Sequence, residues 1–172
     1  MKLVQLNFWQ GRLMTKALEF LRSEAPDIVN LQEVYANGPD INSLGFNNQE
    51  EIQRNLEYPF NYYEPFQTFA FGTSRPSYGM LILSKYPIVK QEAIFTSLAY
   101  NGDFIYGIDD FNIRCLQHVE IRTPKGIVHD YNYHGIWVPG SKDGNTTTEA
   151  HSGVILTQMN KVKGRKILTG DF

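Results

Sequence analysis

The sequence predicts an α+β fold, because helices and strands of several lengths follow one another along a chain of one-domain size. Three observations indicate this class. A strand–helix–strand unit opens the chain, alternating apolar strands fill its middle, and a helix followed by a strand closes it. With 172 residues, of which 42% are hydrophobic, the chain is expected to form one domain, residues 1–172, with a substantial core.

The opening unit consists of a strand at residues 2–8, a helix at residues 14–24 and a strand at residues 27–34. Apolar residues repeat at helical spacing in its middle part, where Thr15 is a candidate cap and Pro26 ends the helix. A crossover of this length joins parallel strands in nearly all known cases.

Parallel strands bring their C-terminal ends to one edge of a sheet, which is where ligands of open α/β sheets usually bind. Asn7 ends the first strand, and Glu33 stands near the end of the second. We therefore expect these two side chains to lie close together.

The remaining elements follow from local patterns. We expect a weak helix at residues 43–56, an irregular strand or loop at 58–72, strands at 80–83 and 88–95, a loop or hairpin at 100–110, alternating strands at 111–121 and 125–135, a helix at 148–162 and a strand at 165–171.

Charge and cysteine content restrict the function. The net charge is −2, from 16 basic and 18 acidic residues without a run of one sign, which argues against a dedicated binder of duplex DNA. No segment is apolar enough for a signal peptide or a membrane span. The single cysteine, Cys115, is expected to be a small buried hydrophobe, and it favours a reducing compartment, the cytoplasm.

Five polar residues at or beside strand ends form a coherent chemical set. Glu33 is a hard oxygen donor of the kind that holds Mg²⁺, and Asn7 can bond a phosphate oxygen without adding negative charge. His134 can act as an acid or as a phosphate donor, and Asp171 can orient or deprotonate an attacking water. Arg114 can clamp a phosphoryl oxygen. Together they predict metal-assisted hydrolysis of a phosphoester.

Each of these residues also has an ordinary interpretation. Glu33 could form a surface ion pair with Lys85 or Arg12, His134 could be a hydrogen-bonded core histidine, and Asp171 could be solvated. For other residues the ordinary interpretation is the stronger one: His118 and His129 are expected to be structural or exposed, and Asp109-Asp110 to form a turn. The aromatic residues between 58 and 71 are expected to pack in the core, with a base-stacking or lipid-docking platform as the alternative.

Three motifs carry a resemblance to a known family. They are "LQEV" at residues 31–34, "LILSKYPI" at residues 81–88 and "GDF" at residues 170–172. In this order and spacing the chain resembles the endonuclease/exonuclease/phosphatase family, which includes deoxyribonuclease-I-like nucleases, apurinic endonucleases, inositol-polyphosphate phosphatases and sphingomyelinases. The resemblance covers essentially the whole chain, but only the first two thirds or so of a family member.

The resemblance implies a four-layer α/β/β/α sandwich of the deoxyribonuclease-I-like type, truncated before its second sheet is complete. It also implies a phosphoesterase that depends on Mg²⁺, with Mn²⁺ as an alternative. By motif, Asn7 and Asp171 match catalytic residues, Glu33 the metal ligand, Arg114 loosely a phosphate-binding arginine, and His134 the histidine near the scissile phosphate. The substrate could be a nucleic acid, a nucleotide, an inositol phosphate or a lipid head group.

Two departures from the family pattern qualify this expectation. The asparagine that follows the "GD" motif is absent, and so is a late Asp-His pair. We therefore expect an inactive piece of a longer enzyme, or one that a second chain completes. A broad apolar sheet face would then be uncovered, available to that second chain or to self-association. The alternative is a non-catalytic binding or interaction module that retains the fold.

Overall fold

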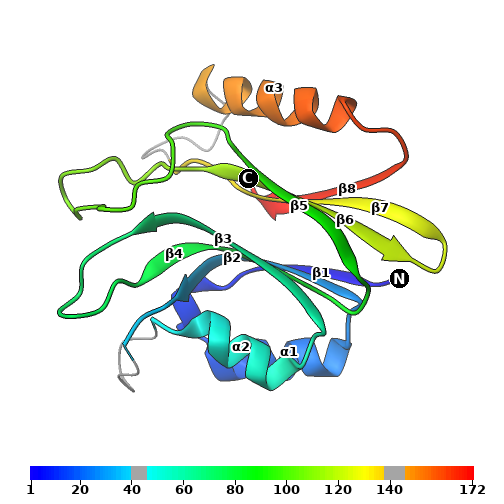
Figure 1. Cartoon of the computed structure of the whole chain (residues 1–172), viewed down its shortest axis with the longest axis horizontal. Coiled ribbons are helices and arrows are strands. Elements are labelled where there is room, and N and C mark those ends of the chain that lie inside the picture. The colour runs from blue at the N-terminus through cyan, green and yellow to red at the C-terminus, as the bar shows by residue number, and fades with distance from the viewer. Residues whose placement is uncertain (40–45, 138–145) are drawn as a thin grey trace.

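The computed structural model describes residues 1–39, 46–137 and 146–172. In chain order its elements are β1 (Leu3–Asn7), the 3₁₀ helix η1 (Trp9–Gly11), α1 (Met14–Glu24), β2 (Ile28–Ala36), α2 (Asn48–Leu56), β3 (Phe60–Thr68), β4 (Ser77–Ser84), β5 (Ile88–Phe95), β6 (Cys115–Thr123), β7 (Gly126–His134), α3 (Thr146–Asn160) and β8 (Arg165–Asp171). Two four-stranded sheets lie face to face, with α1 and α2 outside one and α3 outside the other (Figure 1). The expected four-layer α/β/β/α sandwich is confirmed.

The strand order brings four strand ends to one edge. The first sheet has the order β1-β2-β4-β3, and the second has the order β5-β6-β7-β8. β1 runs parallel to β2, with Asn7 opposite Gln32, and β7 runs parallel to β8, with His134 opposite Asp171. β1 and β8 are end strands of their sheets, so the C-terminal ends of both parallel pairs are free to meet.

Hydrophobic side chains fill three layers of core. In β2, Val29 and Leu31 point outward and pack with Leu18 and Leu21 of α1. Ile28 points inward, where it packs between the sheets in a cluster with Val119 and Ile121 of β6. Beneath α3, Leu116 and Tyr131 pack with Ile155. Alternation along each strand thus places its apolar residues against both neighbouring layers.

The inner faces of the two sheets are also joined by buried amides. Gln32 Nε2 donates to Asn132 Oδ1 at 2.6 Å, and Asn132 Nδ2 donates to Gln117 Oε1 at 3.1 Å. All three side chains are fully buried. A buried amide without a partner costs about 1–3 kcal/mol, so these bonds favour one alignment of the sheets over others.

The structure decides between several alternatives about local structure and corrects one expectation. Of the irregular strand or loop expected at residues 58–72, residues 60–68 form a strand, and a bulge between Pro65 and Gln67 accommodates the proline within the β3–β4 ladder. Of the loop or hairpin expected at residues 100–110, the structure has the loop, which is tied to β3 through Asn101. Thr15 does not cap α1, whose first turn has no side-chain cap. The expected helix start at residues 43–45 lies outside the described residues.

Other expectations are confirmed. Cys115 is completely buried, and burial raises the pKa of its thiol well above the ordinary value. Phe66 and Phe69 are buried, which supports core packing for the aromatic segment. None of the described helices is long and apolar enough to cross a membrane.

The expectation of a broad uncovered sheet face is wrong for the described residues. The second sheet contributes four strands of its own, and these cover the inner face of the first. α1 and α2 cover its outer face. Strands β1 and β8, at the ends of their sheets, are half-buried along most of their length.

One inter-sheet contact involves a buried carboxyl group that has few hydrogen-bond partners. Asn30 Nδ2 donates to Asp130 Oδ1 at 3.0 Å, while Asn30 Oδ1 and Asp130 Oδ2 have no partner. A neutral acid carries a proton on one carboxyl oxygen and avoids an unpaired charge in the interior. Burial raises the pKa of Asp130 from 3.8 to about 7, opposed by the Asn30 hydrogen bond.

A prediction follows for stability against pH. Between about pH 4 and pH 7 the unfolded chain has lost the Asp130 proton while the folded chain keeps it. Folding therefore takes up a proton, and this group lowers the free energy of unfolding by about 1.4 kcal/mol for each unit of rising pH. Asp130→Asn cannot ionise and should remove that slope. Urea denaturation of both proteins from pH 4.5 to 7.5 measures it, and parallel curves would show that Asp130 is ionised when folded.

Candidate functional site

A bulge in β2 directs Glu33 toward the edge where the strands end. The pairing of β2 with β4 shifts register between Leu31 and Val34, and Glu33 itself has a left-handed backbone with φ of 58°. Regular alternation would place Val34 inward, yet it packs in the outer core with the helices. Such a conformation costs a non-glycine residue about 1–3 kcal/mol, and bulges of this kind re-aim side chains next to active sites.

Asn7 connects the two sheets at this edge. Its Nδ2 donates to Glu33 Oε1 at 3.0 Å and to Asp171 Oδ2 at 2.8 Å. Glu33 belongs to the first sheet and Asp171 to the second, so one amide holds two carboxylates from different sheets. The expected proximity of Asn7 and Glu33 is confirmed. Among the described residues, Glu33 forms neither of the ion pairs with Lys85 and Arg12 that were the alternative.

His134 lies beside this pair of carboxylates. Its Nε2 is 3.8 Å from Glu33 Oε1, whereas its buried Nδ1 has no hydrogen-bond partner. Burial, with the nearby Arg114 charge as a smaller cause, lowers the pKa of His134 from 6.5 to about 4. The imidazole is therefore neutral near pH 7, and its contact with Glu33 is not an ion pair.

Arg114 is placed differently from the phosphate clamp that the sequence suggested. Its side chain is only 1% exposed, and its guanidinium donates to the backbone oxygens of Gly135, Phe111 and Ile113 at 2.6, 3.0 and 2.9 Å. It therefore fastens the segment after His134 to the loop before β6.

Gly135 is a site residue that sequence reasoning missed. Its N–H donates to the backbone oxygen of Asp171 at 2.6 Å, and a Cβ at this position would lie 3.0 Å from that same backbone oxygen. A side chain would thus crowd the junction of β7 and β8. The signal available in the sequence was the glycine directly after His134 in "NYHG".

The donor set fits a hard divalent cation. Within the described part of the chain, no three His, Cys, Asp or Glu side chains converge on a point that could hold a metal. Mg²⁺ instead takes one or two carboxylates and completes its shell with water and phosphate oxygens, which suits Glu33 with Asp171 nearby.

The other polar residues considered from the sequence lie elsewhere or have local roles. His118 and His129 bond each other at 3.1 Å on the outer face of the second sheet. Asp109 and Asp110 accept backbone N–H groups within their own loop, which confirms turn chemistry. A surface hollow lined by Arg22, Asn55 and other residues lies at the C-terminal ends of α1 and α2, and none of its lining residues belongs to this site.

Solved structures with the same fold are found over nearly the whole chain. An endonuclease/exonuclease/phosphatase family protein from Leptotrichia buccalis matches with a TM-score of 0.66 at 16% identity, and the match covers 98% of this chain and 66% of that one. Truncated TDP2 from Caenorhabditis elegans matches at 0.61 and 17% identity, covering 98% and 59%. A mannosyl-6-phosphatase from Bacteroides thetaiotaomicron matches at 0.61 and 14% identity, covering 99% and 63%. The chain thus spans two thirds or less of the length of these proteins.

Sequence comparison gives the family directly. No curated protein sequence matches the chain. The model of the endonuclease/exonuclease/phosphatase family, however, matches residues 6–172. This range contains all of Asn7, Glu33, His134 and Asp171, and the chain belongs to the endonuclease/exonuclease/phosphatase family.

Proposed function

We propose that this chain forms the metal- and phosphate-binding part of a Mg²⁺-dependent phosphoesterase. The observation that carries the proposal is the Asn7 amide, which holds Glu33 and Asp171 together across the two sheets. Two carboxylates sharing one neutral amide form a compact negative site that a divalent cation would stabilise. Family membership gives the reaction class, hydrolysis of a phosphoester bond.

Each residue then has a distinct task. Glu33 holds the cation, which when bound supplies positive charge to the phosphoryl oxygens. Asp171 accepts a hydrogen bond from the attacking water and takes its proton, while Asn7 fixes the direction of that carboxylate. The neutral His134 donates one ring N–H to a phosphoryl oxygen, a hydrogen bond that requires no change of its charge.

Arg114 acts as a positioning residue in this proposal. Its three bonds to backbone oxygens keep the segment after His134 against the loop before β6. Its buried charge also disfavours protonation of His134 and so keeps the imidazole neutral.

A second candidate is a binding or interaction module without catalysis. The described site contains one histidine, His134, whereas the family pattern uses a second histidine at the scissile phosphate. This difference favours the non-catalytic module. For the same reason we infer that the 172-residue chain alone hydrolyses phosphoesters slowly or not at all.

The first test addresses the cation site. Glu33→Gln keeps the shape and the acceptor oxygen for Asn7 but removes the charge, so it should weaken Mn²⁺ binding at least tenfold. Electron paramagnetic resonance titration of free Mn²⁺ measures the affinity, and Mg²⁺ competition shows whether the same site takes both ions. Glu51→Gln, on the exposed side of α2, is the matched control and should bind normally.

Two outcomes of that titration would count against the proposal. Equal Mn²⁺ affinity of the wild type and Glu33→Gln would show that the ion does not bind at Glu33. A wild-type chain without measurable Mn²⁺ affinity would favour the module over the enzyme.

A second test concerns the activity of the chain itself. With Mg²⁺ and bis(p-nitrophenyl) phosphate, the 172-residue protein should release nitrophenolate at a rate close to that of its own Asp171→Asn variant. The reason is that the described site supplies one neutral imidazole to the phosphate. Rapid Mg²⁺-dependent release that Asp171→Asn abolishes would show instead that these residues suffice for catalysis.

A further inference from the structure

Basic side chains gather at one end of the second sheet. They come from the turn between β6 and β7 and from the segment between α3 and β8, which Figure 1 shows at the end of the molecule where the N-terminus lies. Six such residues lie there, of which five are exposed and one, Lys166, is half-buried. We call them the basic end: Arg122, Lys125, Lys161, Lys163, Arg165 and Lys166.

Contacts join the two segments into one surface. The Arg165 guanidinium donates to the backbone oxygen of Lys125, 40 residues away in the sequence. A Cβ at Gly126 would lie 3.4 Å from Nη2 of the same guanidinium. Arg122 is paired with Ile127 of β7, and β7 is the strand beside β8. The turn between β6 and β7 and the start of β8 are therefore in direct contact.

Nearby acids do not balance this positive charge. Among the described residues, no carboxylate lies within 4.0 Å of any of the six cations. Glu120, which precedes the turn, lies 3.8 Å from Lys90 of β5 instead. On the first sheet, by contrast, Lys2 is paired with Glu24 at 2.5 Å. The basic end holds six of the 16 basic residues, so the net charge of −2 conceals a marked segregation of charge.

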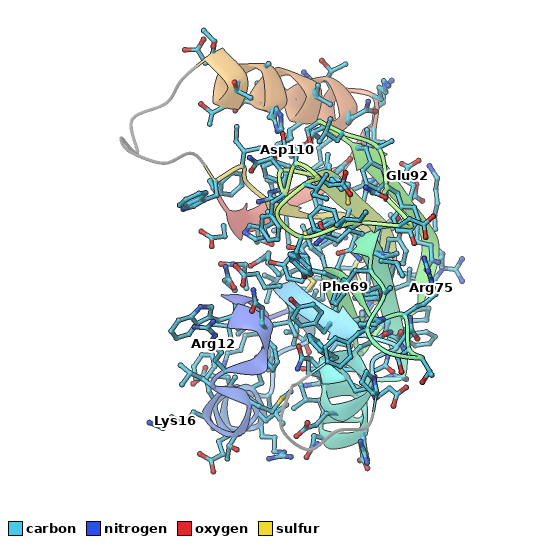
Figure 2. All side chains as sticks on the ribbon, turned by 90° about the vertical axis from the view of Figure 1, so that its left-hand side faces the viewer. Arg12, Lys16, Phe69, Arg75, Glu92 and Asp110 are labelled. Atoms are coloured by element: carbon cyan, nitrogen blue, oxygen red, sulfur yellow. The ribbon has the colours of Figure 1, made fainter. Side chains whose placement is uncertain are left out.

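The candidate site lies at the other end of the same strands. β7 runs from Gly126 to His134 and β8 from Arg165 to Asp171, and nine extended residues span roughly 26 Å. Figure 2 views the molecule from that other end, where Asp110 of the loop between β5 and β6 is labelled. A phosphate bound at the basic end is thus too far away to be the phosphate that the site would cleave.

Two features favour a lipid surface over a nucleic acid as the ligand of the basic end. Residues 120–129 and 161–168 contain no Phe, Tyr or Trp, so a base would find no ring on which to stack. Ile127, opposite Arg122, is 37% exposed, and an apolar side chain among cations can enter the head-group region of a bilayer. Clusters of about four to eight Lys and Arg residues are typical of surfaces that attract anionic phospholipids.

We propose that the basic end docks this protein on a membrane surface rich in anionic phospholipids. The six cations face the lipid phosphates, and the edge that carries the candidate site faces the aqueous phase. The lipid is a docking partner in this arrangement and not a substrate. The inference therefore stands independently of the proposed function.

Co-sedimentation with vesicles tests the docking. At about 0.1 M salt the protein should sediment with phosphatidylcholine vesicles that contain one third phosphatidylserine, and it should stay in solution with pure phosphatidylcholine. Raising the salt to about 1 M should release the protein, because the Debye length falls from about 10 Å to about 3 Å.

Variants locate the binding surface. Lys125→Gln combined with Lys163→Gln removes two charges whose side chains bond no described residue, so the fold should be unaffected. This double variant should bind the phosphatidylserine vesicles about tenfold more weakly. Lys16→Gln combined with Arg54→Gln is the matched control. It changes the net charge equally, at exposed positions of α1 and α2, and should bind normally.

Several outcomes would overturn the inference. Absent binding to phosphatidylserine vesicles, or equal binding to both kinds of vesicle, would show that anionic lipid is not recognised. Equal weakening in the two double variants would show that net charge acts without a defined surface. A duplex oligonucleotide that binds through Lys125 and Lys163, while the vesicles do not, would assign the basic end to a nucleic acid.

Discussion

The structure depends at its functional edge on one neutral amide shared by two carboxylates. Asn7 belongs to an end strand of the first sheet, and it donates to Glu33 of its own sheet and to Asp171 of the other. For one Nδ2 to reach both oxygens, the bulge in β2 and the end of β8 must come within hydrogen-bond distance of the same atom. This condition constrains how the two sheets are stacked. It also places a concentrated negative charge where strand ends and strained backbone meet.

The interior of the sandwich supports that alignment with polar groups as well as apolar ones. The buried chain from Gln32 through Asn132 to Gln117 crosses between the sheets directly below the edge. Apolar packing alone tolerates small shifts of one sheet over another, whereas buried amides lose their partners when the sheets move. Gln32 immediately precedes Glu33, and Asn132 stands two residues before His134. The strands that fix how the two sheets stack therefore also carry the residues of the candidate site.

Much of this could be predicted from the sequence because the signals were local or periodic. The strand–helix–strand opening and the strict order of "LQEV" and "GDF" led to the sandwich and to the meeting of Asn7 with Glu33. What could not be predicted depends on contacts between distant segments. The buried Arg114 side chain is held by backbone oxygens at residues 111, 113 and 135, and alternation along the segment 111–121 gives no indication of these contacts. The covering of the first sheet was likewise missed, because only the pairing of β5 to β8 shows that a second four-stranded sheet is present.

The net charge of the candidate site depends on which of its ionisable groups are neutral in the folded protein. Burial lowers the pKa of His134 to about 4, so this imidazole does not neutralise the adjacent Glu33. The guanidinium of Arg114 is directed at backbone oxygens rather than at the carboxylates. Asn7 supplies hydrogen bonds but no charge. None of the described groups in contact with Glu33 and Asp171 therefore carries a full positive charge. Two carboxylates that accept from one amide repel each other unless a cation lies between them. The geometry that would be unfavourable in a purely structural network is thus one that the divalent ion and the phosphate of the proposed function would stabilise.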